Sequence, residues 1–221
     1  MKIIYAGYGI FGVFGLSKLL SDPNNSVENI IVLETNETSP AADLISNYCK
    51  TYHIKKLNIS ELPSLSFDIV LSVHWRKIIS KSIIEKAKYG GINLHPSLLP
   101  KYAGCSSLAW ALINEEKKVG FTWHLLDAKF DVGDIVLQKE IEVDDKDNAF
   151  SLWNKVNLEG IKYLNKCIEL LTDQSSNFEK QDLTKRTYFK RGFPSYEEIK
   201  QNIPSLSYET YLRASFFPGK T

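Results

Sequence analysis

Hydrophobic positions in the first half of the chain follow two alternating patterns. Short runs rich in Ile, Val and Leu, typical of buried strands, are separated by stretches in which apolar residues recur at helical spacing. Strands are predicted at residues 2–6, 29–33, 67–72 and 91–95, and helices at 10–20, 41–53, 78–88 and 106–113. Strands and helices that alternate in this way form βαβ units. The sequence therefore predicts an α/β fold, with a Rossmann-like, mostly parallel sheet flanked by helices.

The second half of the chain begins with strands and ends in a tail of different character. Two strands joined by a short loop rich in Asp and Gly, and then one long amphipathic helix, are predicted at 120–126, 134–143 and 149–171. The tail is predicted to be a short appendage, residues 179–221, to a main domain at residues 1–178. Its apolar side chains are expected either to cover a dimer interface or to fold back on the core. They are Leu206, Tyr208, Tyr211, Leu212, Phe216 and Phe217.

The overall charge limits the partners that we expect, and the cysteines limit the disulfides and metal sites. The 221 residues carry 27 basic and 26 acidic side chains, so a net charge of +1 provides no global attraction to nucleic acid or to an anionic membrane. The N-terminal apolar run is short and rich in glycine, so we expect neither a signal peptide nor a membrane span, and a cytoplasmic protein. The three cysteines, Cys49, Cys105 and Cys167, are far apart and odd in number. They argue against disulfides and a zinc site, and no metal is expected.

A glycine motif near the N-terminus suggests one enzyme class. Gly7, Gly9 and Gly12 form a GxGxxG pattern between a predicted strand and helix, and Glu34 ends the next strand. This arrangement is typical of dinucleotide binding, where glycines let backbone N–H groups approach a pyrophosphate, and it would make the protein an NAD-dependent oxidoreductase. The alternative is that the glycines only form the tight first turn that the fold needs. The second interpretation is favoured, because nothing downstream supports a hydride-acceptor site.

A second motif ends the predicted strand at residues 91–95. Asn93 and His95 alternate onto the same face at the carboxyl end of this strand, which is the edge where open parallel sheets bind ligands. A carboxamide can bind an oxyanion and an imidazole can move a proton, and acyl transfer to an amine needs both. A histidine buried at a strand end and bonded to a backbone carbonyl is the alternative. The asparagine two residues earlier favours the catalytic interpretation.

These residues belong to a longer pattern that resembles a known family. Asn93–Pro100 reads NLHPSLLP, Gly104 follows, and Phe130–Ile135 reads FDVGDI. Together they resemble the signature of the 10-formyltetrahydrofolate-dependent formyltransferases, which include methionyl-tRNA, glycinamide ribonucleotide and sugar N-formyltransferases. The specific motifs cover roughly residues 60–170, and the rest of the chain is similar only in topology. The resemblance implies transfer of a formyl group from 10-formyltetrahydrofolate, as co-substrate, to an amine.

The resemblance also implies roles for particular residues. Asn93 would hydrogen-bond the formyl oxygen, His95 would stabilise the oxyanion or relay a proton, and Asp131 would orient His95 and assist deprotonation of the amine. The pterin would lie between residues 72–79 and 126–131, where backbone groups would supply much of its recognition. The side chains predicted to contact it are His74, Trp75, Ile78, Asp127 and Ala128. Trp75 departs from the smaller residues often found at its position in the family. A catalytically inactive binding module is disfavoured, because all three catalytic positions are intact.

The tail indicates which amine accepts the formyl group. Methionyl-tRNA formyltransferases carry a C-terminal barrel that the short segment after Thr184 cannot form, and the purine enzymes usually stop after the long helix. Residues 184–194 instead resemble the segment that follows the core in sugar N-formyltransferases. There, Tyr188 or Phe189 could stack on a nucleobase, while a basic side chain meets a diphosphate, with Lys190, Arg191 and Lys77 as the candidates. An ordinary edge strand with charged residues is the alternative.

The predicted acceptor is therefore a nucleotide-linked amino sugar. A dTDP- or UDP-linked 4-amino-4,6-dideoxyhexose destined for a surface polysaccharide is favoured, with glycinamide ribonucleotide and methionyl-tRNA as alternatives. The residues predicted to bind the acceptor are Tyr8, Lys77, Ser97, Tyr188 and Lys190. Neither nucleic acid nor a membrane is expected as a partner, and a homodimer is possible.

Overall fold

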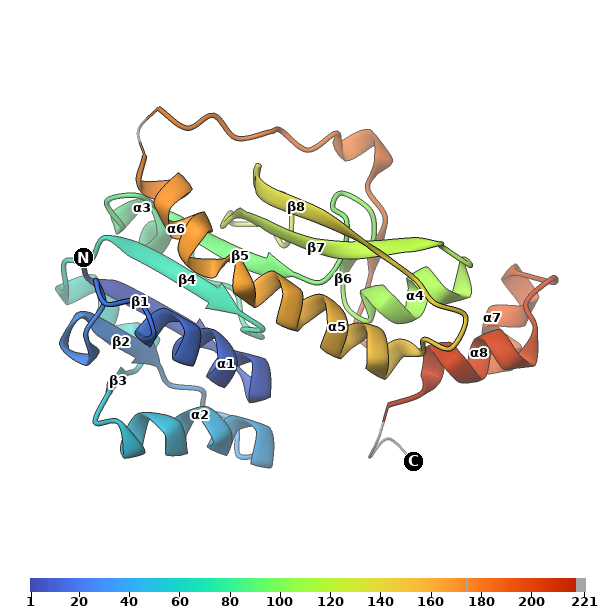
Figure 1. Ribbon diagram of the computed structural model, residues 1–221, viewed down its shortest axis with the longest axis horizontal. Helices are drawn as coiled ribbons and strands as arrows, with labels where there is room; N and C mark the ends of the chain where they lie inside the picture. The colour runs from blue at the N-terminus through green and yellow to red at the C-terminus, as the bar shows by residue number, and fades with distance from the viewer. Residues whose placement is uncertain (174, 218–221) are drawn as a thin grey trace.

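A seven-stranded sheet runs through the middle of the protein, as the computed structural model shows for residues 1–173 and 175–217 (Figure 1). The strands lie in the order β3-β2-β1-β4-β5-β7-β8. Their bounds are β1 Ile3–Gly7, β2 Ile30–Leu33, β3 Lys55–Leu57, β4 Ile69–Val73, β5 Gly91–His95, β7 Lys118–Leu125 and β8 Ile135–Glu142. The first five are parallel, whereas β7 is antiparallel to both β5 and β8. The predicted mostly parallel α/β sheet is confirmed.

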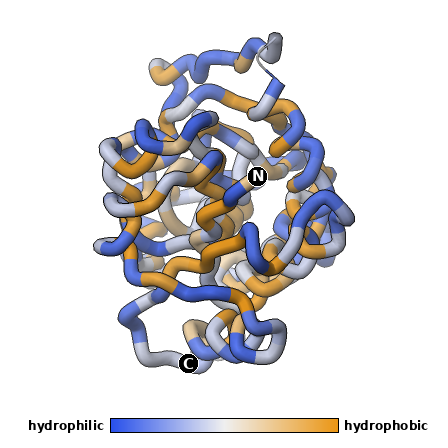
Figure 2. The backbone as a smooth tube through the Cα atoms, turned by 90° about the vertical axis from the view of Figure 1, so that its left-hand side faces the viewer, coloured by the Kyte–Doolittle hydropathy of each residue, from blue (hydrophilic) through white to orange (hydrophobic). Residues whose placement is uncertain are grey.

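Helices cover both faces of this sheet unequally. Their bounds are α1 Gly9–Leu20, α2 Pro40–Thr51, α3 Lys81–Lys86, α4 Ser107–Ile113, α5 Ala149–Lys162, α6 Leu164–Thr172, α7 Tyr196–Asn202 and α8 Tyr208–Ser215. The larger core packs alternate strand residues such as Ile3 and Tyr5 with α1, α2, α4, α5 and α6. The smaller core packs the opposite residues, such as Ile4 and Ala6, with α3. Hydrophobic strands accordingly run through the interior in Figure 2.

The long helix predicted at residues 149–171 is broken into α5 and α6. The carbonyl of Gly160 accepts hydrogen bonds from the buried indole of Trp123, at 2.9 Å, and from the backbone N–H of Tyr163, three residues ahead. The second bond tightens the turn, and Tyr163 lies between the two helices. The break therefore depends on a tertiary contact that periodicity cannot reveal.

The described part of the tail folds back on the core. In α8 and just before it, Ala214 and Leu206 are buried, and the Arg213 guanidinium donates to the backbone carbonyls of Asp147 and Asp144. Leu212 and other apolar side chains of α8 nevertheless remain about half exposed. Residues 218–221, the end of the predicted appendage, lie outside the described residues. None of the helices described is long and apolar enough to cross a membrane.

The glycine motif has a packing explanation. Gly7 ends β1, and α1 begins two residues later at Gly9, whose φ of +63° is in the left-handed region that favours glycine. A Cβ placed on Gly12 would lie 2.9 Å from the carbonyl carbon of Gly7. The first turn of α1 can therefore approach β1 only because both positions lack a side chain. This close contact supports the interpretation of the motif as a tight turn.

Gly12→Ala is expected to push α1 away from β1, because the added methyl group would meet the Gly7 backbone. We expect the free energy of unfolding to fall by about 1–3 kcal/mol, as measured by urea denaturation. Ser17→Ala, at an exposed position of the same helix, is the matched control and should change stability by less than about 0.5 kcal/mol. Equal stability of Gly12→Ala and the wild type would contradict the packing explanation.

Candidate active site

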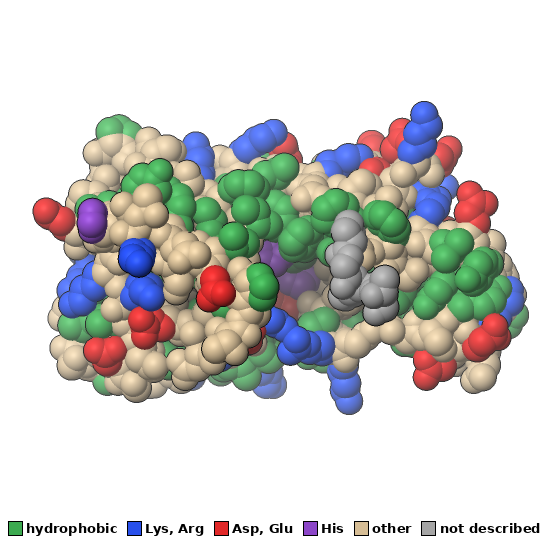
Figure 3. Space-filling view, turned by 90° about the horizontal axis from the view of Figure 1, so that it is seen from below, with side chains coloured by type: hydrophobic (Ala, Val, Ile, Leu, Met, Phe, Trp, Pro, Cys, Tyr) green, Lys and Arg blue, Asp and Glu red, His purple; other side chains and the backbone are tan. Residues whose placement is uncertain are grey.

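The predicted catalytic residues meet at the wall of one cavity of about 700 Å³. It opens beyond the carboxyl ends of β4 and β5, where the loops after β5 and β7 and the tail surround it. Asn93 and His95 both line it from β5, as expected for alternate residues of one strand, and Asp131 reaches it from the loop between β7 and β8. Figure 3 shows histidine side chains at the bottom of this hollow, between hydrophobic side chains.

The Asn93 carboxamide is fixed on two sides. Its Oδ1 accepts a 2.7 Å hydrogen bond from the hydroxyl of Ser72 on the neighbouring strand β4. Its Nδ2 lies 3.1 Å from Nε2 of His124, which is paired opposite Asn93 on the antiparallel strand β7. When His124 is neutral, its Nδ1–H donates to the carbonyl of Leu125, so Nε2 is the acceptor for Asn93. These contacts assign the amide orientation and leave the second N–H of Asn93 available.

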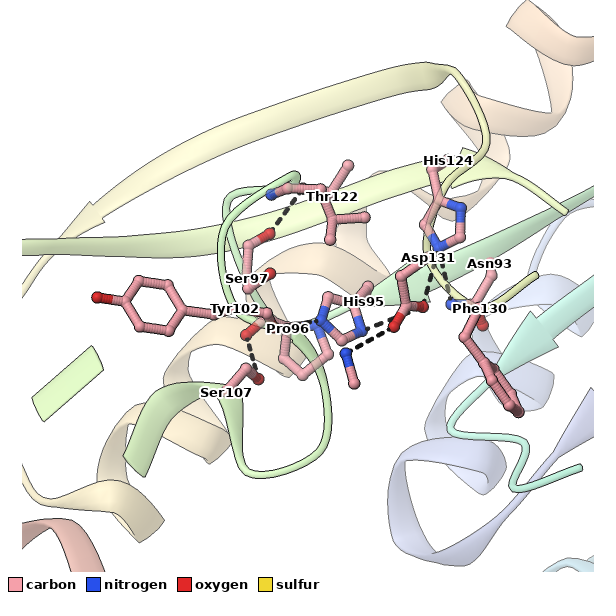
Figure 4. Close-up of polar contacts among 12 residues, drawn as sticks. Asn93, His95, Pro96, Ser97, Tyr102, Ser107, Thr122, His124, Phe130 and Asp131 are labelled. Carbon is pink, nitrogen blue, oxygen red and sulfur yellow. Dashed lines mark hydrogen bonds and ion pairs between the residues drawn. The ribbon is translucent and has the colours of Figure 1, made fainter. Parts of the chain in front are cut away.

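His95 is buried between a backbone carbonyl and a carboxylate (Figure 4). Its Nε2 donates to the carbonyl of Tyr102 at 3.0 Å, and its Nδ1 lies 3.6 Å from Oδ1 of Asp131. An Nδ1 lone pair facing an ionised carboxylate would be repelled by it, whereas an Nδ1–H would be attracted. The carboxylate therefore orients the imidazole, while its Nε2–H is bonded to a backbone carbonyl, as in the alternative interpretation of a buried histidine.

Asp131 is buried and held in a strained backbone conformation, with a φ of +56°. Its Oδ2 accepts a 2.8 Å hydrogen bond from the backbone N–H of Gly104. Burial by itself raises the pKa of this carboxyl, but the charge of His95, the contact with His124 and the Gly104 N–H outweigh it and hold the pKa well below its ordinary value. Asp131 is therefore an anion throughout the neutral range.

His74, predicted to contact the cofactor, is set beside the catalytic pair in a neutral form. Its Nε2 donates to Oδ1 of Asn157 at 2.6 Å, and its ring packs against Phe11 and Trp153. Burial lowers its pKa to about 4, although the hydrogen bond to Asn157 opposes the shift. With Nε2 protonated, Nδ1 is an acceptor available to a donor in the cavity.

The other residues predicted to contact the cofactor line the same cavity. They are Trp75, Ile78, Asp127 and Ala128, and they come from the two segments predicted to enclose the pterin. The indole N–H of Trp75 is buried and has no hydrogen-bond partner within the described residues. A ligand acceptor would satisfy it.

The predicted acceptor residues separate into two groups. Lys77 and Tyr188 line the cavity, whereas Tyr8, Ser97 and Lys190 do not. The Tyr8 hydroxyl instead accepts a 2.9 Å hydrogen bond from Arg76, which does line the cavity. Lys190 lies in an adjoining hollow of about 390 Å³.

Ser97 requires a correction. Its side chain is buried, and its hydroxyl donates to the carbonyl of Lys101 at 2.8 Å, closing the loop that follows β5. Its own carbonyl accepts a bond from the hydroxyl of Thr122. Ser97 therefore shapes the loop that holds His95 and does not face a ligand.

The basic aromatic run of the tail includes a short strand. Tyr188–Phe189 forms β9, which pairs in parallel with β6, Ala103–Gly104. Phe189 stacks on Trp110 with ring centroids 4.4 Å apart, so it is a packing residue. Tyr188 remains on the cavity side, under the guanidinium of Arg186. The edge-strand interpretation thus describes the backbone here, while Tyr188 keeps access to the cavity.

Residues 15–168 match the family described as "Formyl transferase". The chain belongs to the formyl transferase family. GDP-perosamine N-formyltransferase of Brucella melitensis is 36% identical over 151 residues, which are 68% of this chain and 58% of that protein. Methionyl-tRNA formyltransferase of Thermodesulfovibrio yellowstonii is 43% identical over 122 residues, 55% of this chain and 40% of that protein. The chain thus spans little more than half the length of the Brucella relative.

A solved structure shows the same fold. The N-formyltransferase from Helicobacter canadensis, in complex with folinic acid and dTDP-3-aminofucose, matches with a TM-score of 0.79 and 24% identity. The match covers 98% of this chain and 81% of that one. The family membership inferred from the NLHPSLLP and FDVGDI segments is confirmed.

Sequence reasoning missed two residues of the site, His124 and Ser72. His124 lies on a strand that was predicted at 120–126. Its pairing opposite Asn93 follows from the antiparallel register of β7 with β5, and the hydrophobic pattern of a single strand does not reveal such a register. Ser72 was assigned only to the segment beside the pterin, although β4 pairs it with Asn93.

The described residues hold no group of three or more His, Cys, Asp or Glu side chains suited to a metal ion.

Asp131→Asn is expected to destabilise this formyl transferase fold above about pH 5, and by progressively less as the pH falls below about 4. A lowered folded-state pKa means that the ionised carboxylate stabilises the fold above its ordinary value of 3.8, and that this contribution is lost as the pH falls further. We expect a loss of about 1–3 kcal/mol at pH 7 in urea unfolding. Asp145→Asn, at an exposed carboxylate, is the control. A wild-type advantage that grows as the pH falls below about 4 would contradict the assignment.

Proposed function

We propose that the protein transfers the formyl group of 10-formyltetrahydrofolate to the amine of a nucleotide-linked amino sugar. The observation that carries this proposal is the meeting of the Asn93 carboxamide, the His95 imidazole and the Asp131 carboxylate at one cavity wall. Acyl transfer to an amine requires a donor for the developing oxyanion and a group that handles the amine proton. These side chains supply both within a few ångströms.

Each catalytic side chain has one task in this reaction. The free N–H of Asn93 donates to the formyl oxygen as negative charge develops on it. His95 stabilises the charge that develops there, or relays a proton to the departing nitrogen. Asp131 keeps His95 oriented and assists removal of the proton from the amine as its nitrogen bonds to the formyl carbon. Ser72 and His124 hold Asn93 in place for this step.

The cavity fits a folate co-substrate. Its volume of about 700 Å³ lies in the usual range for sites that bind molecules of this size. Trp75 and Ile78 provide an apolar wall against which a planar ring can pack, and the unpartnered Trp75 N–H and His74 Nδ1 offer one donor and one acceptor. The co-substrate supplies the one-carbon group, and the protein supplies orientation and charge.

The acceptor is proposed from the tail and from the comparisons. Tyr188 lines the cavity, and so do the basic residues Lys77 and Arg191. Such a set suits a nucleobase and a diphosphate. The names of the Brucella relative and of the Helicobacter complex both contain nucleotide sugars. We favour a dTDP- or UDP-linked 4-amino-4,6-dideoxyhexose for surface polysaccharide, with GDP-linked sugars to be included in tests.

Two other acceptors remain in the comparison, because methionyl-tRNA formyltransferases also match this chain. The net charge of +1 gives the chain no basic field for tRNA, and an aromatic side chain at the cavity is not needed for glycinamide ribonucleotide. The NAD-dependent oxidoreductase is disfavoured because residues 15–168 match the formyl transferase family. We further expect a cytoplasmic protein, and a homodimer that covers the exposed apolar side chains of α8.

Asn93→Ala is expected to lower kcat for formyl transfer by about 10²–10³, because it removes one donor to the developing oxyanion. The Kd for a folate analogue, measured by calorimetry, should change by less than about threefold, because the amide acts mainly as charge develops. Asn202→Ala, on the exposed face of α7, should leave both quantities unchanged. Unchanged turnover of Asn93→Ala would overturn the catalytic assignment.

A panel of acceptors tests the substrate class. Purified protein is assayed with 10-formyltetrahydrofolate and nucleotide 4-amino sugars, nucleotide 3-amino sugars, glycinamide ribonucleotide and charged initiator tRNA. We expect turnover with a nucleotide amino sugar, and about a tenfold rise in KM for it in Tyr188→Ala, which removes one stacking face. Tyr208→Ala, at an exposed tyrosine of α8, is the matched control. Turnover with glycinamide ribonucleotide or tRNA alone would replace the proposed acceptor.

A further inference from the structure

The backbone around Asp131 is held by a part of the chain that comes, in sequence, after the last strand of the seven-stranded sheet. After α6 the chain runs along β8 to reach β9, as the orange segment of Figure 1 shows. We call residues 179–189 the tail segment. At its start, Glu179 pairs with Ile135 through two backbone hydrogen bonds, of 2.7 and 3.2 Å, just beyond the Asp131 loop.

One side chain of the tail segment bonds two backbone carbonyls of that loop, at and just after the catalytic residue. Nε2 of Gln181 donates to the carbonyl of Asp131 at 3.2 Å and to the carbonyl of Gly133 at 2.6 Å. A second contact comes from Arg186, whose guanidinium donates to the carbonyl of Phe130 at 3.2 Å. Backbone carbonyls at three positions around Asp131 are thus bonded to the tail segment.

The same segment holds the loop that carries the His95 partner. The hydroxyl and the carbonyl of Thr187 accept hydrogen bonds from the backbone N–H groups of Tyr102 and Ala103, at 2.7 and 2.9 Å. The Tyr102 carbonyl in turn accepts from His95, and the next N–H, that of Gly104, donates to Asp131. Both members of the catalytic pair therefore depend on the position of residues 179–189.

We propose that Gln181 is a positioning residue for the reaction, which holds the left-handed Asp131 backbone so that the carboxylate faces His95. This inference rests on the proposed function in one respect, since the reaction supplies its kinetic readout. A non-glycine residue at a φ of +56° is strained, and such a conformation persists only where surrounding contacts determine it. The two carbonyl bonds of Gln181 hold the backbone at this residue and two residues after it.

The geometry at Asp131 leaves little room for movement. Oδ1 lies 3.6 Å from both His95 Nδ1 and His124 Nε2, and Oδ2 is bonded to Gly104. These two histidines, from β5 and β7, are the titratable groups that contact the carboxylate, and Arg186 of the tail segment lies one residue away at Phe130. A displacement of about 1 Å would weaken all three contacts and is enough to slow a reaction by about 10²-fold.

Gln181→Met tests the inference, because methionine has a similar length but no N–H to donate. We expect kcat to fall by about 10- to 100-fold, while KM for both substrates changes by less than about threefold. We also expect the acidic limb of the kcat profile to move to higher pH, because the Asp131 carboxyl would lose contacts that lower its pKa. Gln181→Glu keeps the shape and also lacks the donor, so it should lose turnover similarly. Lys180→Ala, at the exposed neighbouring position, is the matched control.

A titration that needs no substrate separates this inference from the proposed function. Carboxyl NMR of Asp131 should show a higher pKa in Gln181→Met than in the wild type, because its contacts with His95 and Gly104 weaken. If the wild type transfers no formyl group but Asp131 titrates higher in the variant, the function fails and the positioning role stands. If folded Gln181→Met keeps the wild-type kcat, pH profile and Asp131 titration, the positioning role is overturned, and any loss of stability is merely structural.

Should Gln181→Met fail to fold, Gln181→Glu provides the kinetic test. Circular dichroism and urea unfolding establish which variants are folded, and kcat is expressed per folded molecule. A role limited to stability predicts fewer folded molecules, each with normal kcat and a normal pH profile. That result in Gln181→Glu would also overturn the inference.

Discussion

The burial of a carboxylate between two histidines is the constraint on which the site depends. Removing Asp131 from water carries a free-energy cost that only close and well-oriented partners can offset. His95 and the Gly104 N–H provide that compensation, and His124 completes the group around the carboxylate; each comes from a different part of the chain. Two strands and two loops must therefore meet within narrow tolerances, and the antiparallel strand β7 is the element that brings His124 into the group.

The local hydrophobic pattern predicted most strands of the sheet. It did not predict the short edge strand β3, the break between α5 and α6 or the helices of the tail. The alternating apolar runs placed β1, β2, β4 and β5 within a residue or two, because buried parallel strands are continuous hydrophobic segments. Strand β3, with the sequence KKL, is polar and short, so its pairing with β2 left no such signal. The break at Tyr163 and the helices of the tail likewise depend on contacts with distant residues, such as Trp123 and Asp147.

The residues of the site also fall into those that local sequence predicts and those that depend on contacts between distant segments. Asn93 and His95 were predictable because strand alternation places both on one face, and Asp131 because its motif is specific to the family. Ser97 was wrongly assigned to the acceptor, because a sequence does not show whether a hydroxyl faces a ligand or closes its own loop. His124 was missed because its role comes from register between strands, and Gln181 because a side chain that bonds only backbone carbonyls leaves no motif.

The position of the tail segment in the chain has a consequence for biosynthesis. All seven strands and helices α1–α6 are complete by Thr172, whereas Gln181, Arg186 and Thr187 are made later. A nascent chain can thus bury its sheet on the ribosome before the backbone around Asp131 has its donors. The loops around Asp131 therefore acquire these contacts only after the sheet is made, so a growing polypeptide would gain its sheet before its site is complete.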